Sequence, residues 1–593
     1  MNNSSFRKIL LNLGLIKTVV ILKIIKLIFV LVSCSVFFYC SSNQFIDKPN
    51  IILIMSDDMG YSDISSYGGE ISTPNIDDLA MKGLRFTQFY NTSRCCPTRA
   101  SLLTGLYAHQ AGMGGMADSG DRGTPAFRGD LSNNAVTIAE VLKESGYSTY
   151  LSGKWHITPY DDSPEGIKNP NKSNWPVQRG FDKFFGMISG AGSFFDPRSL
   201  AIDNEYIAPT KDFYFTDKVT DYAVKFINQN SNKNPFFMYV AYTAPHWPLH
   251  ALSEDIEKYK GKYDKGWDQI RKERFSRMKE MGIIKDQWEL TSRDINVKDW
   301  SEEIEDRDWE IRNMEVYAAM IDRMDNGIGK IINSLKEKGE YENTLIFYLQ
   351  DNGACSEELD WVKDRQVPDV SQNPMDPLAI QTKMIPTITR EGEPVRLMKN
   401  ALAGGPESYS AYGPSWANAS NTPFREYKHY VHEGGIATPL IVHWPNTIKA
   451  NGDFRRQPSH LIDIMATCVE VSGSKYPRNY KGNTITPMEG KSLVPAFTNS
   501  NLNREALYWE HSGNRAVRMG KWKLVSKAGK DLKMSGQWDK IDKLDQELWE
   551  LFDMEIDRTE TNDISNKHPE KVKVMSQMWM EWARKTGAIP RPN

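Results

Sequence analysis

The sequence predicts an α/β fold in which helices cover both faces of a large sheet, followed by a small C-terminal α+β subdomain. Short apolar runs recur along most of the chain, and stretches of helical character separate them. From about residue 500 the pattern changes to alternating runs closed by one helical stretch. A length of 593 residues allows one large domain and a smaller one.

The apolar runs of the large domain have the length of strands buried on both faces. They span residues 51–55, 147–151, 236–242, 344–349 and 439–444, with helical stretches such as 134–145 and 216–229 between them. Polar residues follow most of these runs closely. Because ligands bind at strand ends in open α/β sheets, we expect a binding site at that edge.

Two segments depart from this alternation. Residues 252–312 are highly charged and helix-prone, which predicts a solvated surface insertion. Residues 356–424 are rich in Pro, Gly, Ser and Asn and lack periodicity. A loop region this long in a compact domain is more often functional than idle.

The C-terminal block has its own pattern. Alternating runs at 506–510, 522–526 and 547–552 precede a helical stretch at 569–585. This pattern predicts a small antiparallel sheet with one helix. We expect three parts in all: a targeting segment at 1–46, a main domain at 47–498 and the subdomain at 499–593.

The N-terminus is typical of a signal peptide or a lipoprotein signal. Basic residues precede an apolar run at 27–39 that is short for an unaided membrane span. Leu31-Val32-Ser33-Cys34 is similar to a bacterial lipobox, and Cys40 is a second candidate for acylation. An uncleaved membrane anchor is the alternative. Each interpretation predicts export, to the periplasm or to the cell surface as an outer-membrane lipoprotein.

The net charge and the cysteine content argue against two classes of protein, nucleic-acid-binding proteins and disulfide-stabilised proteins. The formal net charge is -3 and no extended basic run follows the first thirty residues, so we expect no nucleic-acid partner. Beyond the targeting segment, four cysteines remain: Cys95, Cys96, Cys355 and Cys468. These are too few for a disulfide framework.

Two pairs of polar residues follow apolar runs directly: Asp57 with Asp58, and Asp351 with Asn352. Four hard oxygen ligands at two strand ends could hold Ca²⁺ or Mg²⁺ if the strands are neighbours. Either pair alone is also explained by the frequency of Asp and Asn in turns.

Cys95 lies beside Arg94 and close to Arg99, an environment that could lower the pKa of a nucleophilic thiol. The pattern Cys95-x-Pro97-x-Arg99 is common by chance. The Leu103-Thr104-Gly105 that follows at a fixed spacing makes it far more specific.

This combination resembles the signature of the type I sulfatases, members of the alkaline phosphatase superfamily. Further family motifs follow in order: Asp57-Asp58, Gly153-Lys154-Trp155-His156, His246 within Ala244–Pro248, Asp351-Asn352, and Lys428 ahead of Glu433-Gly434-Gly435. Residues 68–71 and 109–112 are most similar to bacterial arylsulfatases. The resemblance implies an alkaline-phosphatase-like α/β/α sandwich with a large mixed sheet, and makes 47–498 the catalytic domain.

The resemblance also implies a role for each motif residue. A sulfatase-maturation enzyme would oxidise Cys95 to formylglycine, which would attack the sulfate ester. Asp57, Asp58, Asp351, Asn352 and residue 95 would bind one Ca²⁺, or less readily Mg²⁺. Arg99 would hold the hydrated aldehyde, Lys154 and Lys428 would offset sulfate charge, His246 would assist the leaving group, and His156 would accept a proton.

The expected function is therefore hydrolysis of aryl, alkyl or glycan sulfate esters. Alternatives are a phosphonate or phosphate ester hydrolase of the same superfamily and a catalytically dead glycan-binding protein at the cell surface.

Trp155 and Trp247 are expected to pack, and His432 replaces an aromatic residue common in the family. No catalytic role is expected for His109, His250, His429, His443, His460, His511 or His568, although His109 and His250 could line the pocket. Specificity is expected in residues 160–210, 250–310 and 356–424.

Overall fold

The computed structural model describes residues 48–231, 234–362, 365–528 and 549–592. The expected signal or lipoprotein segment, with Cys34 and Cys40, lies outside the described residues. Among those that are described, no helix is both long and apolar enough to cross a membrane. The boundary between residues 498 and 499 stays a prediction.

The predicted large sheet is present, and it is mixed. Five strands run parallel at its centre, in the order β8 (Thr344–Gln350), β1 (Asn50–Ser56), β7 (Phe236–Ala241), β3 (Ser148–Gly153) and β4 (Lys183–Met187). Next to β8 lies β11 (Ala437–His443), antiparallel to both β8 and β2 (Leu84–Tyr90). The edges are completed by β5 (Leu200–Ile202), β6 (Glu205–Tyr206), β12 (Asp453–Arg455) and β13 (Ser459–His460).

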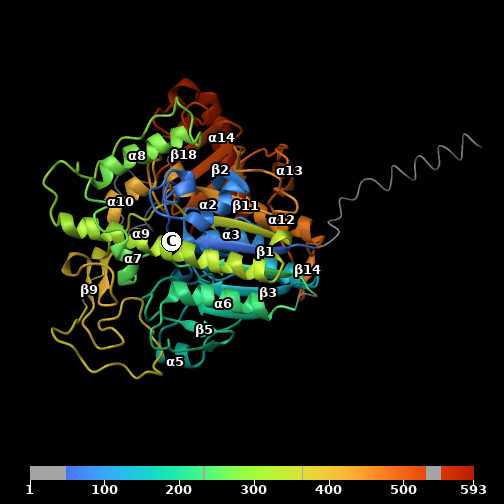
Figure 1. Cartoon of the computed structure of the whole chain (residues 1–593). Helices are drawn as coiled ribbons and strands as arrows, with labels where there is room; N and C mark the ends of the chain where they lie inside the picture. Colours follow the sequence, from blue (N-terminus) through green and yellow to red (C-terminus); the bar gives the residue numbers. More distant parts are fainter. Residues whose placement is uncertain (1–47, 232–233, 363–364, 529–548, 593) are drawn as a thin grey trace, which may run out of the picture. The chain divides into compact units, whose positions relative to one another are not determined.

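The central strands are apolar because both of their faces are covered. Every residue of β1 is buried, and its side chains alternate between the two faces. Ile52 and Ile54 join a core cluster that also contains Ile328 and Ile331 of the long helix α9 (Arg307–Glu337). Helices α2 (Pro74–Met81) and α6 (Phe215–Gln229) pack against α9, and α6 lies beside it (Figure 1).

The other helical group is formed by α3 (Cys95–Thr104), α4 (Ile138–Lys143) and α12 (Asp463–Ser472), which pack on one another. On β3, Tyr150 stacks on Phe226 of α6, so the alternate residues Thr149 and Leu151 face the side where α4 lies. The expected α/β/α sandwich is confirmed.

The expected C-terminal subdomain is also confirmed. Its sheet has the order β16 (Leu507–His511), β17 (Asn514–Met519), β18 (Trp522–Ser526) and β19 (Trp549–Asp553), all antiparallel, and is followed by α14 (Pro569–Thr586). Strand β17 was not predicted because its arginines obscure the alternation. Arg515 lies over the ring of Trp549 at 4.5 Å, and Arg518 hydrogen-bonds Tyr90 and Gln88.

The segment 252–312 is helical and many of its residues are exposed, as predicted, but it is more than a solvated insertion because several of its side chains are buried in the core. Its helices are α7 (Ser253–Glu257), α8 (Gly266–Glu280) and the start of α9. Trp267 and Trp300 are buried and pack edge-on, and Trp267 packs in the same way on Trp416 of α10 (Gly413–Ser420). Arg274 is fully buried and pairs with Asp63 at 2.6 Å and with Glu70 at 2.7 Å. The segment is charged because it carries buried ion pairs as well as exposed residues.

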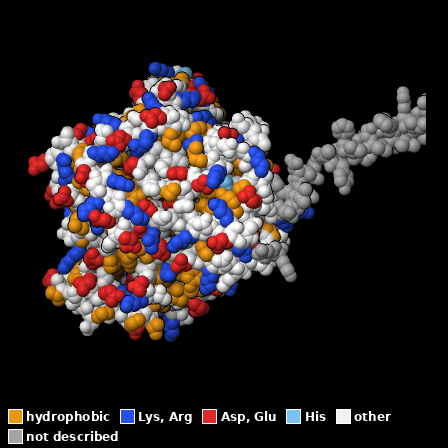
Figure 2. Space-filling model, in the orientation of Figure 1, with side chains coloured by type: hydrophobic (Ala, Val, Ile, Leu, Met, Phe, Trp, Pro, Cys, Tyr) orange, Lys and Arg blue, Asp and Glu red, His pale blue; other side chains and the backbone are white. Residues whose placement is uncertain are grey.

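The described residues of 356–424 are largely irregular, as predicted, apart from α10, the short strands β9 (Arg396–Leu397) and β10 (Ser408–Tyr409), and two single-turn 3-10 helices at Leu359–Trp361 and Met398–Asn400. On the face drawn in Figure 2, basic and acidic side chains are interspersed without a broad basic patch.

Candidate active site

Polar residues follow four adjacent parallel strands at the same edge of the sheet. Asp351 and Asn352 follow β8, Asp57 and Asp58 follow β1, His246 follows β7, and Lys154 and His156 follow β3. Since parallel strands end at the same edge, the sheet order itself gathers these side chains. Every predicted catalytic or metal-binding residue of the large domain reaches this place.

The backbone turns sharply where two of these residues sit. Asp58 and His156 have left-handed conformations, with φ of 66° and 56°. Such conformations are uncommon for residues with a side chain and cluster at functional sites. The turns redirect both side chains into the space beyond the strand ends.

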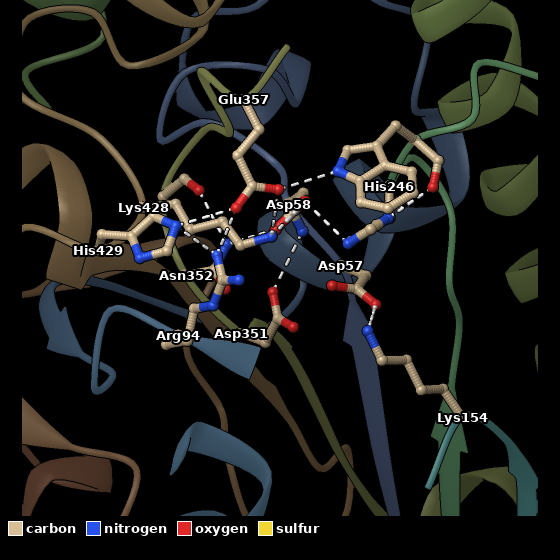
Figure 3. Close-up of polar contacts among 12 residues, drawn as sticks. Asp57, Asp58, Arg94, Lys154, His246, Asp351, Asn352, Glu357, Lys428 and His429 are labelled. Atoms are coloured by element: carbon tan, nitrogen blue, oxygen red, sulfur yellow. Dashed lines mark hydrogen bonds and ion pairs between the residues drawn. The ribbon is translucent and has the colours of Figure 1, made fainter. Parts of the chain in front are cut away.

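Three buried carboxylates meet three buried cations there, and Figure 3 shows Lys154 beside Asp57 and Lys428 beside Asp58. Lys154 Nζ donates to Asp57 Oδ2 at 2.6 Å, and Lys428 Nζ donates to Asp58 Oδ2 at 2.8 Å. Arg99 Nη2 lies 3.3 Å from Asp57 Oδ2 and 3.4 Å from Asp351 Oδ2. Charge pairing of this kind offsets the free-energy cost of removing each charged group from water.

The carboxyl groups of Asp57 and Asp351 differ in their tendency to hold a proton. Burial alone would raise the pKa of Asp57, but Lys154, His246 and Arg99 hold it well below its usual range. Burial and the charge of Asp57 raise the pKa of Asp351 well above its usual range. Adjacent carboxylates resist ionising together unless a cation compensates them.

The donor atoms of this cluster fit a hard divalent cation. Oδ1 of Asp57 and Oδ1 of Asn352 are buried and have no hydrogen-bond partner in the described part of the chain. Ligand atoms of Asp57, Asp58 and His246 lie within 4.8 Å of one another. Carboxylate and amide oxygens are what Ca²⁺ and Mg²⁺ prefer, so Asp57, Asp58, Asp351 and Asn352 are suited to hold such an ion.

Cys95 begins helix α3 at the same edge and is 2% exposed. Its sulfur, the sulfur of Cys96 and a ring nitrogen of His156 lie within 4.8 Å of one another. A hydrogen bond from Cys96 and the charge of Lys154 lower the pKa of the Cys95 thiol well below its usual range, although burial opposes them. Cys95, Cys96, Cys355 and Cys468 are all unpaired, as predicted.

Two glycines are required by close contacts around α3 and His156. Gly105 ends α3 in a left-handed conformation, φ 68°, and a Cβ there would lie 2.7 Å from Cβ of Met465. A Cβ on Gly190 would lie 2.1 Å from Cε1 of His156. Gly190, which sequence reasoning did not identify, thus leaves room for the imidazole.

The tautomer of His246 follows from its neighbours. Its Nδ1 lies 2.6 Å from the carbonyl oxygen of Trp247, which only accepts, so Nδ1 carries a hydrogen. Its Nε2 lies 3.3 Å from Asp58 Oδ2. Burial lowers the pKa of His246, and Asp58 opposes that effect. Because Nδ1 is already protonated, Nε2 can donate a proton only from the imidazolium form.

A cavity of about 420 Å³ opens over Cys95. It is lined by Cys95, His156, His246 and Lys428, and by Arg94, which the sequence analysis placed beside Cys95. It is also lined by residues to which sequence reasoning gave no individual role in the site, chiefly Met116, Asp118, Glu357, Trp361, His429, His511 and Arg591. Two of the three segments expected to set specificity line the cavity. Segment 160–210 contributes Gly190 and Ala191, and segment 356–424 contributes Glu357, Trp361 and Met384. Segment 250–310 contributes no lining residue.

Some expectations about single residues need correction. His109 and His250 do not line the cavity: His109 pairs with Glu510, and His250 Nε2 contacts the carbonyl oxygen of Ser408. Trp155 is fully buried, as expected for packing. Trp247, also expected to pack, contributes to the cavity wall beside Trp361, with ring centroids 6.4 Å apart.

Two family models match this chain. The model described as Sulfatase matches residues 49–474, and the one described as N-sulphoglucosamine sulphohydrolase, C-terminal, matches residues 425–586. The chain is 31% identical to an uncharacterized sulfatase of Schizosaccharomyces pombe, over 92% of this chain and 95% of the relative. It is 33% identical to an arylsulfatase of Klebsiella aerogenes, over 75% and 91%.

Solved structures agree with this likeness. The crystal structure of Ps i-CgsB in complex with k-i-k-neocarrahexaose is 25% identical, with a TM-score of 0.59, covering 92% of this chain and 98% of that one. A structure in complex with its substrate D-glucosamine-2-N,6-O-disulfate is 20% identical, with a TM-score of 0.57, and shares the fold over 92% and 99% of the two chains.

Proposed function

This chain belongs to the sulfatase family, and from that premise we propose that it hydrolyses the sulfate esters of ring compounds, most favourably sulfated sugars, with a formylglycine made from Cys95. The observation that carries this proposal is that the polar residues following four adjacent strands lie together around Cys95. There the thiol lies within 4.8 Å of a His156 nitrogen, beside Lys154.

We propose the following roles for the chain's own residues. One hydroxyl of the hydrated aldehyde at position 95 loses its proton to Asp351, and its oxygen attacks sulfur. The bond from sulfur to the ester oxygen then breaks, and His246, as the imidazolium, gives its Nε2 proton to the leaving oxygen. The second hydroxyl loses its proton to His156, the aldehyde reforms, and sulfate leaves. Water then rehydrates the aldehyde, and of the two protons held by Asp351 and His156 one returns to His246 and the other leaves to solvent.

Charge stabilisation comes from groups already in place. Lys154 and Lys428 are buried beside the reaction centre and can shift from their carboxylates to the sulfate oxygens, while Arg99 holds the diol. The bound divalent cation would add Lewis acidity and lower the pKa of an oxygen ligand.

Calcium is the ion that we propose. Three carboxylates and an amide make a protein-rich oxygen site, whereas Mg²⁺ usually keeps several waters. We expect removal of the ion by chelation to lower both sulfate release and thermal stability. A ligand present at about 100 times its Kd stabilises a protein by about 2.7 kcal/mol, so the melting midpoint should fall.

This expectation is checked by calorimetry on chelated protein with Ca²⁺ or Mg²⁺ added back. Recovery of the midpoint and of activity by Ca²⁺ supports the assignment. A midpoint that chelation leaves unchanged, in protein shown by elemental analysis to be metal-free, would contradict it.

A ring-shaped substrate is supported by the cavity wall. Trp361 is 45% exposed, an unusual exposure for tryptophan, and stands edge-on to Trp247 beside the cavity. Flat aromatic faces of this kind can pack against aryl rings and the apolar faces of sugars. The relatives named above include one solved with a carbohydrate hexaose and one with a sulfated glucosamine.

Two alternative functions remain to be separated by experiment. A phosphonate ester hydrolase would share the formylglycine, and a dead glycan-binding protein would keep the fold. We expect turnover of a ring sulfate to exceed that of the matched phosphonate and of an alkyl sulfate by at least about tenfold, compared as kcat/KM. Faster phosphonate turnover, or glycan binding without sulfate release from converted protein, would reject the proposal.

Two further proposals rest on the sequence. A sulfatase-maturation enzyme would act on Cys95 during biosynthesis, and the N-terminal segment would direct export, with acylation at Cys34 or Cys40 as one outcome. Mass spectrometry of the mature N-terminus distinguishes a lipoprotein from a cleaved signal peptide and from an uncleaved anchor.

A further inference from the structure

Glu357 is a carboxylate in the cavity wall that no catalytic motif includes. It lies five residues after Asn352, and its side chain is 14% exposed (Figure 3). Burying an anion beside a site for a sulfate ester is unfavourable, since like charges repel and desolvation adds to the cost. Its presence therefore requires an explanation in terms of what it binds.

Each oxygen of Glu357 contacts more than one neighbouring side chain. Oε1 accepts from Arg94 Nη1 at 2.6 Å and lies 2.9 Å from His429 Nε2. Oε2 accepts from Trp247 Nε1 at 3.0 Å and lies 3.9 Å from Lys428 Nζ. One carboxylate thus joins three loops that are remote in sequence.

The neighbours of Glu357 flank the proposed catalytic groups. Arg94 directly precedes Cys95, and Lys428 is itself proposed to bind sulfate. Trp247 follows His246, and its carbonyl oxygen fixes the imidazole through Nδ1. A shift of Glu357 would therefore move groups on three sides of the cavity together.

The electrostatics favour a permanently ionised Glu357. Burial alone would raise the pKa of its carboxyl, but Lys428 and Arg94 hold it well below the usual range. Burial and Arg94 lower the pKa of His429 to about 4, so that ring is neutral at neutral pH. The carboxylate accepts hydrogen bonds at both oxygens, and an amide could not replace it without turning an N–H toward a donor.

We propose that Glu357 is a positioning residue that sets Lys428, Trp247 and Arg94 around the reacting sulfate. The inference rests on the proposed sulfatase function. Displacements of about 1 Å in a catalytic group can lower rates by about 100-fold. We therefore expect Glu357→Gln to lower kcat about 10- to 100-fold, with a smaller, several-fold rise in KM because Lys428 also holds the sulfate group of the bound substrate.

The matched control is Glu358→Gln, which removes the same charge at the next position, where the side chain is exposed. We expect its kcat to stay within about twofold of wild type, and the melting midpoints of both variants to stay close to wild type. If Glu357 acted only by repelling anions, Glu357→Gln would bind substrate more tightly at unchanged kcat. That result would overturn the proposal.

A binding measurement separates this inference from the sulfatase proposal itself. Titration with inorganic sulfate needs no turnover, and mispositioned Lys428 should weaken sulfate binding several-fold in Glu357→Gln but not in Glu358→Gln. If converted wild-type protein released no sulfate from any ester, the proposed function would fail and the titration alone would decide. Equal or tighter sulfate binding by Glu357→Gln would then refute the positioning role.

Discussion

Replacement of Cys95 by alanine is expected to abolish sulfate release, by about 10⁴-fold or more, and to leave the fold intact. The side chain at position 95 supplies the atom that becomes the nucleophile, and removing a covalent nucleophile costs several orders of magnitude. The measurement is kcat/KM with an aryl sulfate, for wild type and variant both co-expressed with a sulfatase-maturation enzyme. Unfolding curves check that the variant is folded.

Cys468→Ala is the matched control, because it removes another buried, unpaired thiol, on α12 next to α3. It should keep wild-type activity. Substantial turnover by Cys95→Ala would exclude the formylglycine mechanism. Inactivity of both the wild type and the variant would direct attention to the mass of the peptide carrying residue 95, which reveals whether oxidation took place.

Replacement of Arg558 by methionine is expected to destabilise the protein by about 3 kcal/mol or more. Arg558 is fully buried, its Nε donates to Glu433 Oε2 at 2.8 Å, and its guanidinium lies 4.9 Å from the ring centre of Phe424. Breaking one side of a buried ion pair typically costs about 3–5 kcal/mol, because the remaining charge stays buried. Lys523 Nζ still lies 2.9 Å from Glu433 Oε1 and compensates its charge. The expected loss of stability therefore lies at the lower end of that range.

Urea unfolding of wild type, Arg558→Met and the exposed-site control Lys573→Met measures this effect. The control should change the free energy of unfolding by less than about 0.5 kcal/mol. If Arg558→Met were as stable as wild type, the buried network would be energetically neutral, and its function would lie in positioning alone.

The sequence predicted the site best where a family motif directly follows a predicted strand. Asp57, Lys154, His246 and Asp351 each follow a strand, so a strand prediction and a family motif point to the same place. Their meeting depends on β8, β1, β7 and β3 being neighbours, which a single sequence does not specify. The resemblance to a known family supplied that order.

Residues around the rim of the cavity could not be predicted in this way. Glu357, His429, His511 and Arg591 come from loops and from the C-terminal part of the chain, and no local period or spacing relates them. Their side chains meet only through tertiary packing. Similarly, Arg274 contributed to an apparently solvated segment because charge counts do not reveal whether a charge has a buried partner.

The buried charges around Glu433 also bear on the order in which the protein is made. Glu433 follows Lys428 by five residues, whereas Lys523, Arg558 and Glu560 lie far downstream. During synthesis the chain emerges from its N-terminus, so Cys95 leaves the ribosome long before the last partners of Glu433 exist. Glu433 has its full set of buried partners only when the residues that follow the final strand β19 have been made. For the maturation enzyme proposed above, this interval is a time in which the thiol of Cys95 lies on an unfinished fold.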